Sequence, residues 1–171
     1  MNFEQNPKHT RGLAFCSVLL FFLFTLQYSG HLPRLNGATP FNLLLPAVVF
    51  AGMFFGPWQG AMIGLVTGIF ADAISAGATG FNTIAFFLIG CICGLFIQHL
   101  LNNTVVAALL LSAGSALLFE TGRYLFSYII IGYENTAFYY LRYSLVSAAL
   151  TTLIALPIYF LFKKLMKTTN R

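Results

Sequence analysis

Apolar segments follow one another along almost the whole chain, with only short polar turns between them. Six of them are predicted to be membrane helices, over residues 12–28, 41–55, 58–76, 81–99, 105–131 and 138–162. A helix that crosses a bilayer needs about 17 to 25 predominantly apolar residues. Only 8 % of the 171 residues are charged, against roughly 25 % in a soluble protein. The sequence therefore predicts an all-α integral membrane protein, a six-transmembrane-helix bundle that forms one domain over residues 1–171.

Positive charge is concentrated near the two ends of the chain. Lys8 and Arg11 precede the first apolar segment, and the last one ends in Lys163, Lys164, Lys167 and Arg171. Cations next to membrane helices favour the cytoplasmic side, and an even number of helices places both ends on one side. We therefore expect a multi-pass protein of the bacterial cytoplasmic (inner) membrane with both termini cytoplasmic.

The net charge of +5 thus indicates topology and contact with anionic lipids. It does not indicate nucleic-acid binding, because no basic groove with interleaved aromatic residues accompanies it. The first thirty residues are similar to a signal peptide, but no A-x-A cleavage site follows them. We therefore expect a retained first helix.

Four charged residues fall near or within the predicted helices: Asp72, Glu120, Arg123 and Arg142. Under the expected topology all four lie in the outer leaflet, where an unpaired charge costs about 2.5 to 3.5 kcal/mol on insertion scales. Glu120 and Arg123 are i,i+3 neighbours that can pair on one helix. Asp72 needs a partner from elsewhere, either Arg123 or Arg142, or Asn82 with Thr83 and the free N–H groups that open the next helix. The predicted outer-leaflet polar cluster comprises Asp72, Asn82, Glu120, Arg123 and Arg142.

Three roles are open for this polar cluster. It can be a satisfied network that holds helices together, a small-molecule site, or part of a proton or ion path. We favour the network, because no chain of acidic residues continues through the inner half of the membrane.

Glycines recur at every fourth position before Asp72. Gly60, Gly64 and Gly68 form a stripe on the predicted helix 58–76 that ends at this aspartate. Small residues at this step let a second helix backbone come close. Gly90 and Gly94 repeat the pattern on the next helix. These five glycines indicate either packing between helices of this chain, which we favour, or a groove for a partner's helix.

No catalytic pattern is present in the sequence. It contains no Ser-His-acid set, HExxH motif, P-loop or paired carboxylates at catalytic spacing. Cys16, Cys91 and Cys93 lie in apolar segments without a CxxC or metal-ligand spacing, and small buried side chains are the favoured interpretation. We therefore expect no enzyme activity, no metal and no cofactor.

Residues 41–96 carry a family resemblance. The stretch PFNLLLPAVVFAGMFFGPWQGAMIGLVTGIFADAISAGATGFN combines an apolar span, a GxxxG turn, and a second span that closes on Gly68, Asp72 and Ser75 before Gly80 and Asn82. This pattern resembles the MreD family of rod shape-determining proteins, and the resemblance extends over nearly the full length. The Glu120 and Arg123 pair has no counterpart in the family pattern.

The resemblance implies a non-catalytic subunit of the machinery that elongates rod-shaped bacteria. Its implied partners are the transmembrane helix of MreC and, through MreC, the MreB filament, RodA and a class B penicillin-binding transpeptidase. It also implies a fold like that of the S components of energy-coupling-factor vitamin transporters. A substrate-binding S component is therefore the alternative function. Against it, the first helix reads LAFCSVLLFFLFTLQ and lacks the A-x-x-x-A face with which S components meet their transporter.

Overall fold

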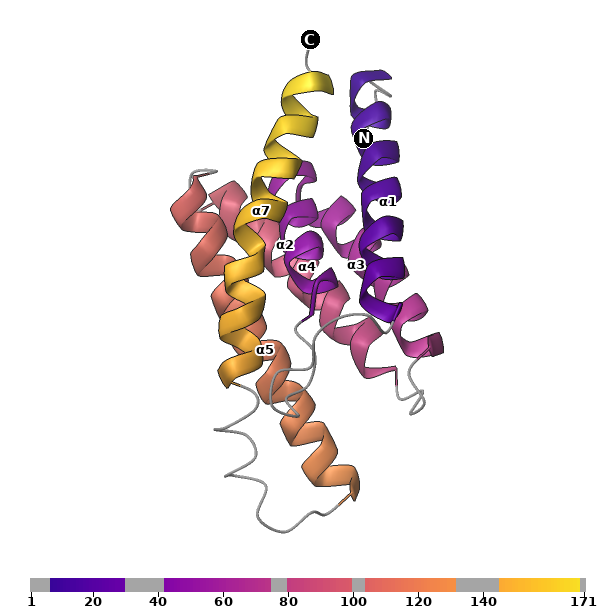
Figure 1. Ribbon diagram of the computed structural model, residues 1–171, viewed down its shortest axis with the longest axis vertical. Helices are drawn as coiled ribbons and strands as arrows, with labels where there is room; N and C mark the ends of the chain where they lie inside the picture. Colours follow the sequence, from indigo (N-terminus) through magenta and orange to yellow (C-terminus); the bar gives the residue numbers. More distant parts are fainter. Residues whose placement is uncertain (1–6, 30–41, 75–79, 100–103, 132–144, 170–171) are drawn as a thin grey trace.

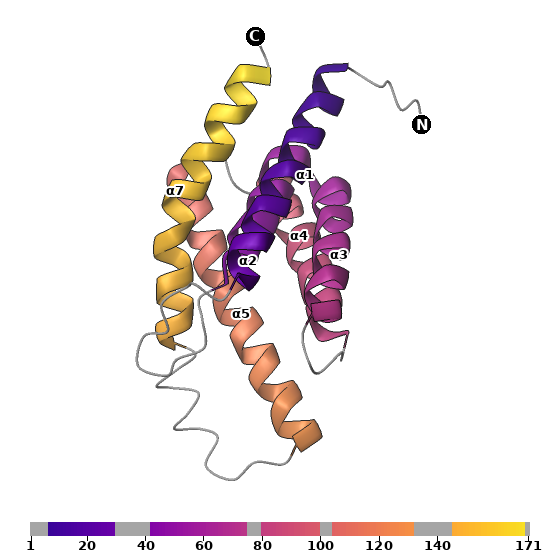
Figure 2. The same cartoon turned by 45° about the vertical axis from the view of Figure 1, so that its right-hand side comes forward.

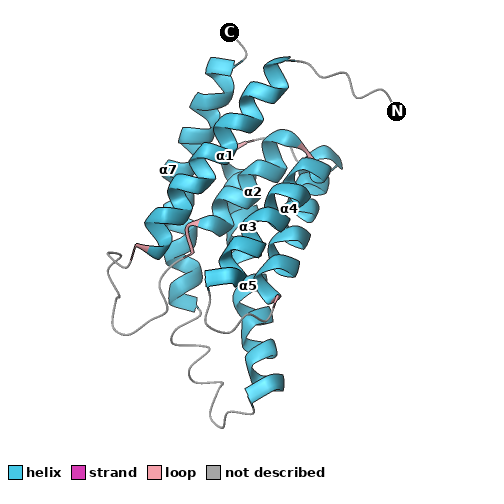
Figure 3. Cartoon of the chain, turned by 90° about the vertical axis from the view of Figure 1, so that its right-hand side faces the viewer, coloured by secondary structure: helices cyan, strands magenta, loops and turns pink. Residues whose placement is uncertain are grey.

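The structure is a computed structural model that describes residues 7–29, 42–74, 80–99, 104–131 and 145–169. These residues form six helices (Figures 1 and 3), and no strand occurs among them. The helices are α1 (Pro7–Tyr28), α2 (Leu44–Phe55), α3 (Pro57–Ile74), α4 (Phe81–His99), α5 (Val105–Ile131) and α7 (Leu145–Thr169). The predicted all-helical class is confirmed.

The predicted boundaries hold closely for the middle of the chain and less well at its ends. Helices α4 and α5 have the predicted limits. Helix α1 begins five residues earlier than predicted, at Pro7, because proline suits the first position of a helix. Helix α7 continues to Thr169 rather than residue 162, because lysines are good helix formers. Residues 75–76 and 138–144, which we predicted to be helical, lie outside the described residues.

Three helical segments are long and apolar enough to cross a membrane: Phe81–His99, Val105–Phe126 and Val146–Lys164. Two shorter apolar helical segments are Cys16–Tyr28 and Leu44–Phe55. These segments agree with a membrane protein. The predicted total of six membrane-crossing helices stays a prediction.

Helix α2 is the centre of the fold. Every residue from Leu44 to Met53 is buried, and α2 contacts α1, α3, α4, α5 and α7. It is seen between α7 and α1 in Figure 1. A helix that is apolar on all sides is found in a protein core or in contact with lipid, and α2 is the first of these because other helices enclose it. The continuous apolar sequence of α2 therefore makes it the core around which the other helices pack.

Polar side chains of three segments meet at the start of α2. Asn42 caps the helix, since its Oδ1 accepts hydrogen bonds from the N–H groups of Leu44 at 3.0 Å and Leu45 at 3.3 Å. Gln27 of α1 accepts from the N–H of Leu43 at 2.9 Å, and Thr151 of α7 accepts from the N–H of Asn42 at 3.2 Å. The free N–H groups at a helix start are costly when buried. These contacts satisfy them and tie α1 and α7 to α2.

The other end of α2 turns directly into α3. Gly56 has φ of 95°, a conformation that residues with a Cβ rarely adopt, and its N–H donates to the carbonyl of Gly52 at 3.0 Å. Pro57 then occupies the first position of α3, as helix starts favour. The turn folds α3 back along α2, and this brings the glycines of the two helices together.

Candidate functional site: the α3–α4 contact and its polar end

The glycines of α3 have no side chains, and this allows the backbone of α3 to come close to that of α4. A Cβ placed on Gly64 would collide with the carbonyl group of Phe86, and one on Gly68 would collide with the Cα of Thr83. A Cβ on Gly60 would lie 2.8 Å from the carbonyl oxygen of Gly90. Helix backbones therefore touch along α3 and α4, as they do where small residues line a membrane-helix interface.

The glycines of α4 make the reciprocal contacts. A Cβ on Gly90 would collide with the carbonyl of Gly60, and one on Gly94 would lie 2.6 Å from the nitrogen of Pro57. Gly60, Gly64, Gly68, Gly90 and Gly94 are all buried. The structure thus places them in a contact between helices of this chain. It leaves no space on these glycines for a partner's helix, which was the other interpretation.

Gly52 belongs to the same contact, although it is not one of the five glycines predicted from the sequence. A Cβ on Gly52 would lie 2.5 Å from the carbonyl oxygen of Gly90. The turn at Gly56 and Pro57 separates Gly52 from the α3 stripe along the chain. The repeat of one glycine every four residues continues through that turn, and this was the signal that could have identified it.

Asp72 lies where the α3–α4 contact ends, near the C-terminal end of α3. Its side chain is 8 % exposed. Oδ1 accepts hydrogen bonds from the side-chain and backbone nitrogens of Asn82, at 2.9 and 3.3 Å. Oδ2 accepts from the Oγ1 of Thr83 at 2.6 Å and from its backbone N–H at 2.8 Å. The carboxylate therefore caps the first turn of α4, where N–H groups lack partners and the helix dipole favours negative charge.

The glycine stripe and the Asp72 cap depend on each other. Gly68 lies one turn before Asp72 on α3, and it packs against the backbone of Thr83, the residue that donates twice to the carboxylate. A side chain at position 68 would push away the start of α4. The close approach at Gly68 is thus what brings Asp72 within hydrogen-bonding distance of α4.

Glu120 forms a separate contact between α5 and α7. It is 6 % exposed, and its Oε1 accepts a hydrogen bond from the Oγ of Ser147 at 3.0 Å. Ser147 lies one turn before Thr151, which binds at the start of α2. One face of α7 therefore supplies hydroxyl groups to two other helices. Neither hydroxyl residue was predicted from the sequence, because serine and threonine are common in membrane helices without such a role.

Of the two arginines predicted to pair with these carboxylates, Arg123 alone lies within the described residues. Arg123 is exposed, and within the described segments no ion pair joins it to Asp72 or Glu120. Within these residues the donors to both carboxylates are neutral groups of neighbouring helices. Arg123 lies three positions from the buried Glu120 but is not buried with it, and its pairing stays a prediction. Arg142 lies outside the described residues.

The arrangement at Asp72 suits a mechanical role. Four donors of the same chain already occupy its two oxygens, so a ligand would have to displace them. Within the described residues, no three His, Cys, Asp or Glu side chains gather as a metal site would require. The hydrogen bonds of Asp72 fix the position of the start of α4 relative to α3.

Exchanging Glu120 for alanine tests the contact between Glu120 and Ser147. We expect a loss of about 1 to 3 kcal/mol in the free energy of unfolding, the usual cost of leaving a buried polar group without its partner. The matched variant Glu120→Gln keeps an oxygen that accepts from Ser147, so we expect little change. Thermal unfolding in detergent measures both. Equal destabilisation by the two exchanges would mean that the charge, not the hydrogen bond, matters.

Comparisons with known proteins place the chain in a family. No match was found among curated proteins or among solved structures. The family model described as rod shape-determining protein MreD matches residues 9–169, which is nearly the whole chain and contains both polar contacts described above. The resemblance predicted from residues 41–96 is thereby confirmed, and the chain belongs to the MreD family of rod shape-determining membrane proteins.

Proposed function

We propose that the chain is a non-catalytic scaffold of the bacterial cell-elongation machinery in the cytoplasmic membrane. In this role it binds the transmembrane helix of MreC and, through MreC, is connected to MreB, RodA and a class B penicillin-binding transpeptidase. Membership of the MreD family supports a role in rod shape. The observation that carries the scaffold role is the Asp72 cap, whose acceptor oxygens are all used to join α3 to α4.

The proposal includes the orientation of the chain. All six helices cross the membrane, in a bundle like that of S components, and both termini are cytoplasmic. Two observations support this. Helix α1 begins and helix α7 ends at the same end of the bundle (Figure 2), as an even number of crossings requires. The cations of the chain are concentrated at these two ends, as the cytoplasmic side favours.

The partner helix docks on the outer surface of the bundle. The glycine stripe is buried, so it stabilises the scaffold rather than contacting the partner. Large apolar side chains are exposed on several helices, among them Phe22 of α1, Ile84 of α4, Leu118 of α5 and Leu153 of α7. These four positions lie on four different helices, and each marks a surface on which a single apolar helix can pack.

Photo-crosslinking tests the proposal. A photoreactive amino acid is placed singly at Phe22, Ile84, Leu118 or Leu153, and MreC is co-expressed. We expect crosslinks to the MreC transmembrane segment from one or two neighbouring positions and not from the others. The wild-type chain should co-purify with MreC and restore rod shape to cells that lack their own MreD. A stable chain that does neither would refute the scaffold role.

The S-component alternative makes a different prediction. A purified S component would bind a small vitamin without any partner, and a ligand screen by thermal shift would detect it. No observation at Asp72 favours this, because its oxygens bind Asn82 and Thr83. We expect no vitamin to raise the unfolding temperature.

A further inference from the structure

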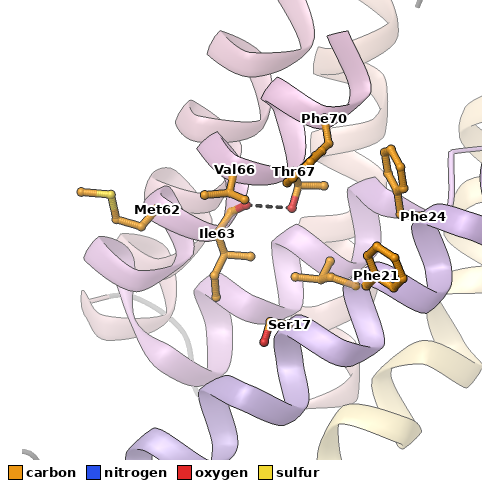
Figure 4. A pocket seen from close by; sticks show the side chains of 9 residues that line it. Ser17, Phe21, Phe24, Met62, Ile63, Val66, Thr67 and Phe70 are labelled. Carbon is orange, nitrogen blue, oxygen red and sulfur yellow. Dashed lines mark hydrogen bonds between the residues drawn. The ribbon is translucent and has the colours of Figure 1, made fainter. Parts of the chain in front are cut away.

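An apolar groove lies between α1 and α3, outside the contacts described above. Its volume is about 450 Å³, within the range of roughly 300 to 1,000 Å³ of small-molecule sites. The side chains that line it come from two turns of each helix: Ser17, Leu20, Phe21, Phe24, Met62, Ile63, Val66, Thr67 and Phe70. Thr67 donates its hydroxyl to the carbonyl of Ile63 at 2.7 Å (Figure 4). The hydroxyl of Thr67 is thus used within its own helix, and the walls are otherwise almost entirely apolar.

The groove is closed at one end and wide at the other. Phe24 and Phe70 meet edge to face at the outer end, with ring centroids 6.0 Å apart. Just beyond them, the hydroxyl of Tyr28 donates to the carbonyl of Ala71 at 3.5 Å. At the opposite end Ser17 and Met62 lie well apart (Figure 4). An occupant that lies along the groove from the side of the chain termini therefore ends at Phe24 and Phe70.

The length of the groove corresponds to one leaflet of a bilayer. Trp58 is 65 % exposed at the start of α3, where tryptophan favours the headgroup level. Met62 lies four residues further along α3 and Phe70 twelve, which is about 6 Å and 18 Å at a rise of 1.5 Å per residue. Half of the hydrocarbon core is about 15 Å thick. The closed end thus lies near the middle of the membrane.

Positive charge lies beyond the wide end of the groove. Arg11 and Lys8 precede Ser17 on α1 by six and nine positions, or about 9 and 14 Å along the helix. This separation places them at the level of lipid headgroups on the side of the termini. Cations at that level attract anionic headgroups. Cations at the headgroup level and apolar walls below that level together match an anionic phospholipid.

We propose that this groove binds one acyl chain of an anionic phospholipid of the leaflet on the side of the termini, with its headgroup at the level of Lys8 and Arg11. A partner's transmembrane helix fits less well, because it would have to continue past the closure at Phe24 and Phe70 to cross the membrane. An acyl chain ends where the groove ends. The proposal rests on the membrane orientation given above but not on the binding of MreC.

Lipid photolabelling of the purified chain tests this site. The probe is a phosphatidylglycerol with a diazirine near the end of one acyl chain, incorporated into phosphatidylcholine vesicles, and adducts are mapped by mass spectrometry. We expect several-fold more adducts on the groove segments 17–24 and 62–70 than around Leu110 of α5, which is 63 % exposed. Adducts that follow exposure alone would overturn the proposal.

Two variants of α3 make the test specific. Val66 and Ile69 are both 51 % exposed, but only Val66 lines the groove. Val66→Trp should reduce the adducts in the groove several-fold, whereas Ile69→Trp should leave them unchanged. Equal effects of the two exchanges would refute the acyl-chain site.

The preference for an anionic headgroup is tested with a phosphatidylcholine probe that carries the same diazirine acyl chain. Fewer adducts than with phosphatidylglycerol are expected, and equal labelling would refute selection by charge. Because only the purified chain is used, failure of this test is separate from failure to bind MreC.

Discussion

Exchange of Gly64 for alanine is expected to destabilise the bundle more than any other single methyl addition in the α3–α4 contact. The new Cβ would collide with the backbone carbonyl of Phe86. A backbone group cannot move aside as a flexible side chain can, so the two helices must separate. Overpacking of a well-packed core typically costs about 1 to 3 kcal/mol, and occasionally more. We expect the upper part of this range, measured as a lowered midpoint of thermal or denaturant unfolding in detergent.

Gly114 provides the matched control for this prediction. It also lies inside an apolar helix, α5, but a Cβ there would have no neighbour within 4 Å. Alanine in a helix is favoured over glycine by roughly 0.5 to 1 kcal/mol, so Gly114→Ala should keep or slightly raise the stability. If Gly64→Ala were as stable as Gly114→Ala, α3 and α4 would not be in backbone contact.

Exchange of Asp72 for alanine is the second large effect that we expect. It removes the acceptor of four hydrogen bonds from Asn82 and Thr83. A hydrogen bond to a charged group contributes about 1.5 to 3 kcal/mol, and such contributions are not additive. We expect a loss of about 3 kcal/mol in the free energy of unfolding. Faster hydrogen exchange should be seen at the start of α4, because the N–H groups of its first turn lose their acceptor.

Asp72→Asn distinguishes the cap from a role of the charge in transport or ligand binding. Its amide keeps one oxygen that can accept from Asn82 or Thr83, so about half of the destabilisation should be recovered. Support of rod shape in cells should then follow stability across the two variants. A fully stable Asp72→Asn chain that fails to support rod shape would show that the charge itself is needed for function.

The sequence was a good guide to the helices and a poor guide to their polar contacts. Helices α4 and α5 could be predicted to the residue, because a long apolar segment between polar turns has few alternatives to a helix in a membrane. The hydrogen bonds of Asp72 were foreseeable in part, since Asn82 and Thr83 open the next helix after a short turn. In contrast, the contacts of Glu120 with Ser147 and of Asn42 with Thr151 join residues 27 and 109 positions apart. No local pattern encodes such distances.

The exposure of Arg123 is another feature that spacing along the chain did not predict. Its spacing from Glu120 allowed an ion pair on one helix, but Glu120 turns toward α7 and Arg123 is exposed. Spacing along a helix fixes which residues share a face. Which neighbour covers that face is set by how the helices pack.

By itself the sequence determined that the chain is helical, apolar and similar to the MreD family, because these properties depend on composition and on local order along the chain. Only the tertiary structure decided that the five glycines are buried between helices of the bundle, that Asp72 caps α4, and that α1 and α3 leave a groove between them. The physical reason is that close packing acts between surfaces. Whether a glycine meets a backbone or open space depends on a few tenths of an ångström in the position of another helix, and that position is fixed only when all the helices have assembled around α2.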